Sequence, residues 1–408
     1  MADLISTHCI APATVLRGDQ AWSSAQPIVG RICRQPILLG RSEATAGLRQ
    51  GLFEDLGAVG LCPQWAELQH DCCEEDLQPL QGQAMAWGAD AVIAAGGGKV
   101  LDAGKLLAQR LERPCITVPL SASTCAGWTA LANIYTAAGA FQHDEVLDRC
   151  PELLIFDHGL VRQAPARTLA SGIADALAKW YEASVSSGAS TDGLIQQAVQ
   201  MARVLRDQLL IDAPEALQDR QSSAWVRVAE ACALTAGVIG GLGGARCRTV
   251  AAHAVHNGLT QLQACHGVLH GEKVGFGILV QLRLEEALGG HQLAGQARRQ
   301  LMPLMRSLDL PVSLEDLGLA EASLADLKQV CQFACREGSD LHHLPFAVSS
   351  GALLEALIGA SEEHQLTTAN LATANPGTAN PGTANPGTAN STTFSNKASS
   401  TTGSDRSP

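Results

Sequence analysis

The chain has 408 residues, of which 46% are hydrophobic, 4% aromatic and 17% charged, and its formal net charge is −12. This length and apolar content exceed what one small core needs, so we expect two domains. An acidic chain without a run of Lys and Arg excludes a general electrostatic grip on nucleic acid or on an anionic membrane surface.

Thirteen cysteines are scattered along the chain without a CxxC pair. The chain begins MADLI, with no basic residues leading into an apolar stretch, and no segment offers eighteen apolar residues free of charge. We therefore expect a cytoplasmic protein with reduced thiols and no membrane partner.

Four short apolar runs mark the first part of the chain, at 36–40, 91–95, 115–119 and 153–156. Each is bounded by Gly, Pro or Asp, which is typical of buried parallel strands, and the amphipathic segments between them predict crossover helices. The sequence therefore predicts an α/β domain over residues 1–163.

Strand signals fade after residue 164, where long periodic stretches rich in Ala and Leu take over, at 168–184, 193–210 and 224–239. They predict an all-helical domain over residues 164–365.

The last segment, 366–408, changes character. Thr-Ala-Asn recurs five times and Asn-Pro-Gly three times, and the segment holds three charged residues and one aromatic. Because it cannot bury enough apolar surface to offset its ordering entropy, we predict a disordered tail; a docking or spacing element is the alternative.

A glycine-rich loop follows the second apolar run, where three successive glycines precede Lys99 and an amphipathic helical segment. Glycines let a ligand approach the backbone, and the free N–H groups of a helix start suit a phosphate. It is not a Walker loop, because Val100 follows Lys99, and Leu101 stands where a GxGxxG pattern needs glycine. A pyrophosphate cradle and a plain strand-to-helix turn both fit, and Asp102 and Lys105 form either a surface ion pair or a cofactor-orienting pair.

Asp175 is a single carboxylate in an otherwise apolar, alanine-rich helical segment. Downstream, four of the 12 histidines fall within eighteen residues, and the pairs His253/His256 and His266/His270 are each spaced to share a helix face. They are either core and capping histidines or metal ligands. One carboxylate with two imidazoles makes three protein ligands with a position open for substrate, the arrangement of a catalytic metal.

With these residues the chain resembles the iron-containing (group III) alcohol dehydrogenase superfamily, and within it the glycerol dehydrogenase branch. The motifs occur in the family's order and cover roughly residues 10–360. They are Gly-Gly-Gly-Lys-x-x-Asp at 96–102, Pro-x-x-Ala-Ser-Thr at 119–124, Ile-Tyr-Thr at 134–136, Ala-Pro-Ala-Arg at 164–167, Gly-x-x-Asp-Ala-Leu-Ala-x-Trp at 172–180, Ala-His-Ala-Val-His-Asn-Gly at 252–258 and His-Gly-Glu-Lys-Val at 270–274.

The resemblance implies a Rossmann-like nucleotide-binding domain followed by a helical metal-binding domain, the dehydroquinate synthase-like fold. It also implies NAD or NADP, one divalent metal (Zn or Fe), a small-molecule alcohol or carbonyl substrate and a homo-oligomer. The implied metal ligands are Asp175, His253 and His270, and His256 is a candidate catalytic residue that supports a ligand or relays a proton. The implied cofactor-binding residues are Gly96, Gly97, Gly98, Lys99, Asp102, Ser121, Thr124, Leu131 and Tyr135.

Three positions depart from the glycerol dehydrogenase pattern. Cys125 stands at the substrate position where that branch carries the Asp that contacts the polyol, which puts glycerol in doubt. Gly40-Arg41-Ser42 stands where NAD-preferring relatives place an acid, so we favour NADP, with Arg41 and Ser42 receiving the 2′-phosphate. Arg246 and Arg248 stand at small neutral positions and either receive an anionic substrate or form ion pairs within the protein.

Two other functions compete with a dehydrogenase. Dehydroquinate synthase-like cyclases are lyases with similar His motifs, but their first ligand is typically Glu, and Asp175 favours the dehydrogenase. A non-catalytic relative that binds nucleotide or metal is the other alternative, against which all three metal positions and the glycine loop are intact.

Overall fold

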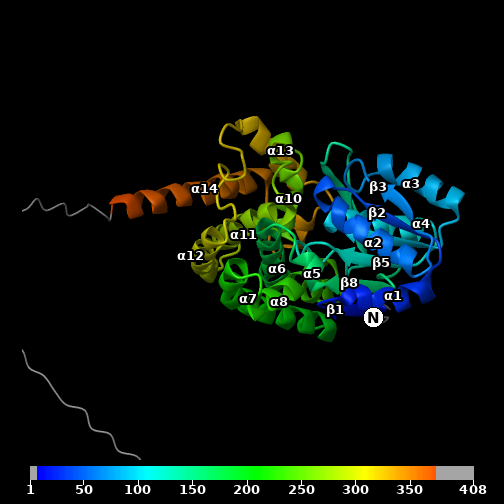
Figure 1. The fold of residues 1–408 in the computed structure, drawn as a ribbon. Coiled ribbons are helices and arrows are strands. Elements are labelled where there is room, and N and C mark those ends of the chain that lie inside the picture. The colour runs from blue at the N-terminus through cyan, green and yellow to red at the C-terminus, as the bar shows by residue number, and fades with distance from the viewer. Residues whose placement is uncertain (1–6, 374–408) are drawn as a thin grey trace, which may run out of the picture. The chain divides into compact units, whose positions relative to one another are not determined.

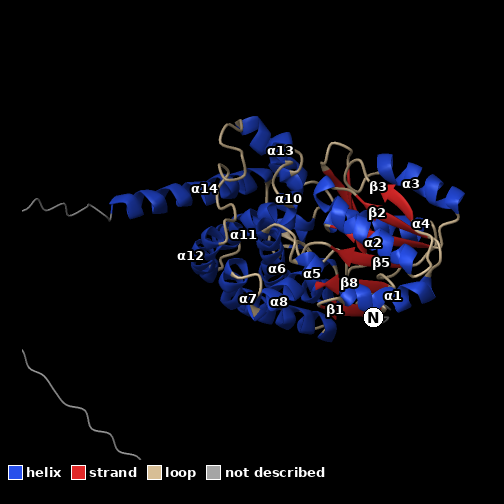
Figure 2. Cartoon of the chain, viewed as in Figure 1, coloured by secondary structure: helices blue, strands red, loops and turns tan. Residues whose placement is uncertain are grey.

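The computed structural model of the protein describes residues 7–373, of which 362–373 are described as backbone only. Its first half contains a six-stranded parallel sheet (Figure 2). In spatial order the strands are β1 (Thr14–Gly18), β8 (Leu153–Asp157), β5 (Cys115–Pro119), β4 (Ala91–Gly96), β2 (Pro36–Gly40) and β3 (Gln64–Glu67).

Helices cover both faces of this sheet. Successive side chains of a strand point to opposite faces, so Leu38 packs with α1 (Ala21–Ile32) and α2 (Ala46–Ala58), while Leu39 packs with α3 (Glu74–Trp87) and α4 (Gly98–Arg110). A short helix, α5 (His158–Val161), follows β8, and the 3₁₀ turn η1 (Glu43–Thr45) precedes α2. The layers are those of a doubly wound α/β domain (Figure 1).

The strand order brings three loops together at the carboxyl ends of neighbouring strands. β5, β4 and β2 are neighbours, and the register pairs Gly96 with Pro119 at their carboxyl ends. The loops after these strands carry Arg41, Gly98 and Thr124, and ligands of open parallel sheets bind at these ends. An antiparallel hairpin of β6 (Leu131–Tyr135) and β7 (Phe141–Val146) lies outside the main sheet.

The second half of the described chain is helical (Figure 2). The helices are α6 (Ala166–Ser187), α7 (Gly193–Gln218), α8 (Ser223–Glu230), α9 (Ala236–Gly243), α10 (Ala251–Leu259), α11 (His270–Ala287), α12 (Gln292–Ser307), α13 (Leu324–Ala334) and α14 (Ser350–Thr373). A π-helical turn, η2 (Ala231–Thr235), joins α8 to α9, and 3₁₀ turns are η3 (Ala245–Cys247), η4 (Gln263–Cys265) and η5 (Asp340–His343).

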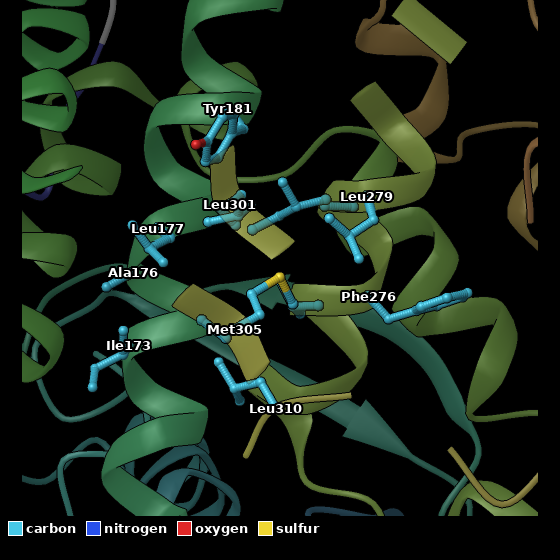
Figure 3. Close-up of a cluster of buried hydrophobic side chains, with 14 of the residues drawn as sticks. Ile173, Ala176, Leu177, Tyr181, Phe276, Leu279, Leu301, Met305 and Leu310 are labelled. Atoms are coloured by element: carbon cyan, nitrogen blue, oxygen red, sulfur yellow. The ribbon is translucent and has the colours of Figure 1, made fainter. Parts of the chain in front are cut away.

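α6 is the central helix of this half, because it packs against both α7 and α11, and side chains of α12 reach the same apolar cluster. Figure 3 shows Ile173 and Leu177 of α6 beside Met305 of α12, with Phe276 of α11 nearby. All four side chains belong to one buried cluster. The face of α6 that carries Asp175 is thereby left for the boundary with the α/β half.

Two glycines set how closely α6 approaches its neighbours. A Cβ on Gly271 would overlap the carbonyl of Ser171, and a Cβ on Gly172 would overlap the carbonyl of Ala122. The Gly271 N–H also donates a hydrogen bond of 3.0 Å to the Ser171 hydroxyl. This close approach brings His270, the first residue of α11, toward Asp175 one turn after Ser171.

The predicted fold class is confirmed, and the four predicted strands coincide with β2, β4, β5 and β8. The helices predicted at 168–184 and 193–210 are α6 and α7, and the one at 224–239 is divided by η2. The change from mixed to all-helical structure falls between β8 and α6, near the predicted boundary at 163/164, although Met1–Leu366 form one compact unit. Two separate folding domains therefore stay a prediction.

The first eight residues of the predicted tail, 366–373, belong to the backbone of α14. α14 continues through Thr373, because no Gly or Pro interrupts the chain between Gly359 and Pro376. The rest of the predicted tail, 374–408, lies outside the described residues.

Among the described residues, one helical stretch, Ser223–Gly243, has the length and apolar character to cross a membrane. Buried residues make up 61% of its most apolar window, and Trp225, Val228 and Ile239 belong to the core. This burial is typical of a core helix, so the stretch does not indicate a membrane span.

Candidate active site

One cavity of about 430 Å³ is lined by residues of both halves of the described chain. Nearly all predicted site residues meet there. Those lining it are Arg41, Ser42, Gly97, Gly98, Lys99, Asp102, Ser121, Thr124, Cys125, Leu131, Tyr135, Asp175, His253 and His270. The predicted residues outside the lining are Gly40, Gly96 and His256.

The glycine loop supplies a helix start at the cavity wall. Gly97 caps α4, and a Cβ on Gly98 would come within 3.0 Å of Thr124 Cγ2, so this close backbone approach leaves little room for a side chain. The first N–H groups of α4 have no partner inside the helix and suit an anion. The loop therefore fits the phosphates of a dinucleotide.

Asp102 and Lys105 form a buried pair 3.0 Å apart, which excludes an ordinary surface ion pair. The ammonium also donates to the Thr129 carbonyl at 3.0 Å, and the Asn133 N–H donates to Asp102 at 3.3 Å. Burial raises the pKa of Asp102, and the Lys105 ammonium opposes this shift. The pair fixes the β6 strand against α4 and places one carboxylate in the cavity lining.

Two cations, Arg41 after β2 and Lys99 in the first turn of α4, share one acidic partner. The buried carboxylate of Asp71 pairs with both of them. Ser42 accepts the Ala44 N–H at the start of η1, and Gly40 packs against the side chain of Arg49. Asp71 thus already neutralises two of the cations available to a dinucleotide phosphate.

The three predicted metal ligands converge. Oδ1 of Asp175 lies 3.3 Å from Nε2 of His253 and 3.6 Å from Nε2 of His270, and the ligand atoms of the three residues all lie within 4.8 Å of one another. α6, α10 and α11 each supply one of them. Two imidazole nitrogens and one carboxylate oxygen beside an open cavity are the donor set of a catalytic divalent metal, so the residues fit the group that the resemblance implies.

Each imidazole is oriented by a partner on its other nitrogen. Nδ1 of His253 lies 2.7 Å from Oε2 of Glu182, a carboxylate with no exposed surface. Nδ1 of His270 lies 3.0 Å from Nε2 of His256, whose Nδ1 is 2.8 Å from Oδ1 of Asn257. If each Nδ1 carries the proton, every bond in this chain has one donor and both ligand Nε2 atoms stay free.

The pKa shifts agree with this proton arrangement at two of the histidines. Burial lowers the pKa of His256 well below its usual range, and burial also lowers the pKa of His270, so both rings are neutral. Burial would lower the pKa of His253, but the carboxylates of Glu182 and Asp175 together outweigh it and raise the value to about 9. A metal would therefore displace a proton from His253 when it binds.

The carboxylate of the triad is strongly acidic. Burial would raise the pKa of Asp175, but Lys179 and the hydrogen bonds from His253 and His270 hold it well below its usual range. Lys179 follows Asp175 by one turn of α6 and lies 3.4 Å from Oδ1.

Sequence reasoning missed Lys179 and Glu182. Both lie on the Asp175 face of α6, at i+4 and i+7, and this spacing in an alanine-rich helix is the signal that could have identified them. Of the two predicted arginines, Arg248 lines the cavity, while Arg246 is exposed and does not. The pairing of His266 with His270 on one helix was wrong, because α11 begins at His270 and His266 lies exposed before Gly267.

The family described as iron-containing alcohol dehydrogenase matches residues 12–158. An uncharacterized oxidoreductase of Synechocystis sp. is 53% identical over 358 residues, which cover 88% of this chain and 92% of that protein. Glycerol dehydrogenase of Pseudomonas putida is 34% identical over 335 residues, 80% of this chain and 87% of that enzyme. The crystal structure of a probable glycerol dehydrogenase from Sinorhizobium meliloti has a TM-score of 0.78 at 27% identity and covers 89% of this chain and 100% of that one. The chain therefore belongs to the iron-containing alcohol dehydrogenase superfamily, in its glycerol dehydrogenase-like branch, and is an oxidoreductase that acts on CH–OH groups.

Proposed function

We propose that the cavity is the active site of an NADP-preferring dehydrogenase in which Asp175, His253 and His270 hold one Zn²⁺ or Fe²⁺. One observation supports this proposal above all. The three metal ligands and the glycine loop are more than seventy residues apart in the sequence, and they line the same cavity. When bound, the metal supplies a Lewis acid for the substrate oxygen and the dinucleotide supplies the hydride acceptor or donor.

The protein's own residues position and shield this chemistry. Glu182 and His256 hold the two ligand imidazoles with Nε2 toward Asp175, and the Gly98 loop receives the phosphates. Buried Leu131 and Tyr135 give the cavity an apolar wall that excludes water from a nicotinamide ring. His256 contacts His270 and does not line the cavity, so we assign it a positioning role.

The cyclase alternative is not favoured, because the matching relatives are dehydrogenases. The thirteen unpaired cysteines support a cytoplasmic enzyme, and we extend the proposal to a homo-oligomer on the family resemblance alone.

The proposal is tested by loading the protein with Zn²⁺ or Fe²⁺ and following absorbance near 340 nm with small hydroxy compounds and their carbonyls. We expect substrate-dependent interconversion of NADP⁺ and NADPH that a chelator abolishes and added metal restores. A metal-loaded protein that binds dinucleotide but never changes its redox state would support the cyclase or the non-catalytic relative instead.

The choice of dinucleotide depends on Arg41. Its side chain is 38% exposed and forms an ion pair with Asp71. The 2′-phosphate of NADP would replace Asp71 as the partner of this guanidinium. We expect kcat/KM to be higher with NADPH than with NADH, and Arg41→Ala to lower the NADPH value about tenfold or more while changing the NADH value little, since a charge-assisted hydrogen bond is lost. Arg31→Ala, at the exposed end of α1, is the control. A wild-type preference for NADH would refute the assignment.

A further inference from the structure

Lys179 is a buried cation that belongs neither to the three metal ligands nor to the glycine loop. Its side chain is 3% exposed and lines the cavity. The ammonium makes two long hydrogen bonds, 3.4 Å to Oδ1 of Asp175 and 3.3 Å to the Arg248 carbonyl, and an ammonium has three donors. One N–H is therefore left for a ligand within the described site.

The Lys179 ammonium lies beside the three metal ligands, where the substrate oxygen would bind. Oδ1 of Asp175 is approached by Lys179 and also by the Nε2 atoms of His253 and His270. A group bonded to the reacting carbon would be within reach of Lys179 while the neighbouring oxygen faces the three metal ligands, because the ammonium and both Nε2 atoms lie within 3.6 Å of Oδ1 of Asp175.

Arg248 supplies a second cation whose hydrogen bonding is incomplete. Its Nε is buried without a partner, and its Nη2 lies 3.4 Å from Oδ2 of Asp144, a long contact with a half-exposed carboxylate. The side chain lines the same cavity. Guanidinium groups bind carboxylates through parallel N–H groups, and this one, with Nε unpaired and Nη2 only weakly paired, has donors that no protein acceptor satisfies.

Position 125 also differs from a polyol-binding site, because a neutral Cys stands where the glycerol dehydrogenase branch carries an Asp. The thiol of Cys125 is buried, and burial raises its pKa, so this side chain is neutral. Its charged neighbours include Lys179, Asp175 and Arg248. A carboxylate here would neutralise Lys179 and repel an anionic substrate, whereas a neutral thiol leaves the cation available.

Besides Asp102 and Asp175, two acids line the cavity, Asp144 and Asp340. Burial raises the pKa of Asp340, and Asp144 is its repelling neighbour, which limits the negative charge that the two present together. With a divalent metal at Asp175, the cations Lys179 and Arg248 would then carry charge that an anionic substrate balances.

We propose that the substrate is a short 2-hydroxycarboxylate or its 2-oxocarboxylate, with the carboxylate bound by Lys179 and Arg248. This proposal rests on the proposed dehydrogenase function and specifies its substrate class. In oxidation, the C2–H bond breaks and hydride with its two electrons passes to C4 of NADP⁺ or NAD⁺. The hydroxyl proton leaves to solvent, and the products are the 2-oxocarboxylate and the reduced dinucleotide.

The test compares substrates that share a carbon skeleton: pyruvate against hydroxyacetone, and glyoxylate against glycolaldehyde. We expect the wild-type holoenzyme to reduce each acid with a kcat/KM at least about tenfold higher than its neutral partner. Arg248→Gln should lower kcat/KM for the acids about 10- to 100-fold, mainly through KM, and should lower it much less for the neutral carbonyls. Lys179→Gln should lower kcat/KM for the acids at least as much, and it should also lower the values for the neutral carbonyls because Lys179 contacts the metal ligand Asp175. Arg246→Gln, on the exposed neighbour of Arg248, is the matched control and should change neither class.

A second readout needs no turnover. Oxamate, a non-reacting analogue of pyruvate, should bind the wild-type holoenzyme by calorimetry and bind at least about tenfold more weakly to Arg248→Gln, whose partly exposed side chain makes it the variant less prone to misfold. Equal or better use of hydroxyacetone, together with unchanged oxamate binding in Arg248→Gln, would overturn the substrate assignment while leaving the dehydrogenase intact. Preference for dihydroxyacetone phosphate over pyruvate would replace the carboxylate by a phosphate. Absence of dinucleotide turnover with every compound would refute the proposed function itself.

Discussion

Replacing His270 with alanine should lower kcat/KM by at least about a thousandfold, for any substrate that the enzyme accepts. The change removes one of the three donor atoms that lie within 4.8 Å of one another, and a bound metal contributes several kcal/mol to transition-state stabilisation. The purified variant should also hold less than stoichiometric Zn²⁺ or Fe²⁺ after dialysis, which elemental analysis measures independently of activity.

His266→Ala is the matched control for that experiment. His266 lies four residues earlier, is exposed, and makes one ring hydrogen bond, from Nε2 to the Thr260 carbonyl at 3.0 Å. We expect its metal content to equal that of the wild type and its kcat/KM to stay within about twofold. Equal losses in both variants, or a fully active His270→Ala, would show that the triad is not the metal site.

The sequence was most informative where a segment is buried on both faces. β2, β4, β5 and β8 are fully buried and therefore appear as unbroken apolar runs. β1 and β3 are edge strands with polar residues such as Arg17 and Gln64, so no run marks them. The β6–β7 hairpin was missed because β7 is largely exposed and polar.

In the candidate site, the metal ligands could be predicted from the sequence, but their hydrogen-bond partners could not. Asp175, His253 and His270 were predicted because two imidazole-rich segments and the family motifs marked them, and the structure brings them together. The partners of those residues depend on tertiary packing: Glu182 reaches His253 across 71 positions of sequence, and Asp71 reaches Lys99 across 28. No local pattern encodes which carboxylate meets which cation, although the i, i+4, i+7 spacing of Asp175, Lys179 and Glu182 marks the helix face on which to look.

Glu182 gives the second large effect, because it fixes the proton of His253. The carboxylate accepts the Val250 N–H at 2.7 Å, the His253 N–H at 3.0 Å and Nδ1 of His253 at 2.7 Å. In Glu182→Gln the amide can keep the two backbone bonds through its oxygen, but its NH₂ group then faces Nδ1–H, donor against donor. The proton must move to Nε2, the atom that faces Asp175, and the metal loses a ligand lone pair.

We therefore expect Glu182→Gln to weaken Zn²⁺ binding about 10- to 100-fold, measured by competition with a chelator of known affinity, and to lower activity in proportion when metal is limiting. Glu285→Gln tests whether this follows from burial alone. Glu285 is also a buried carboxylate beside a histidine, with Oε2 3.4 Å from Nδ1 of His291, but it does not line the cavity. It should lose some stability and keep the wild-type affinity for Zn²⁺. If both variants lose metal equally, the effect arises from disturbing the helical core; if neither does, the orientation of His253 is set by its backbone and Glu182 serves α10 alone.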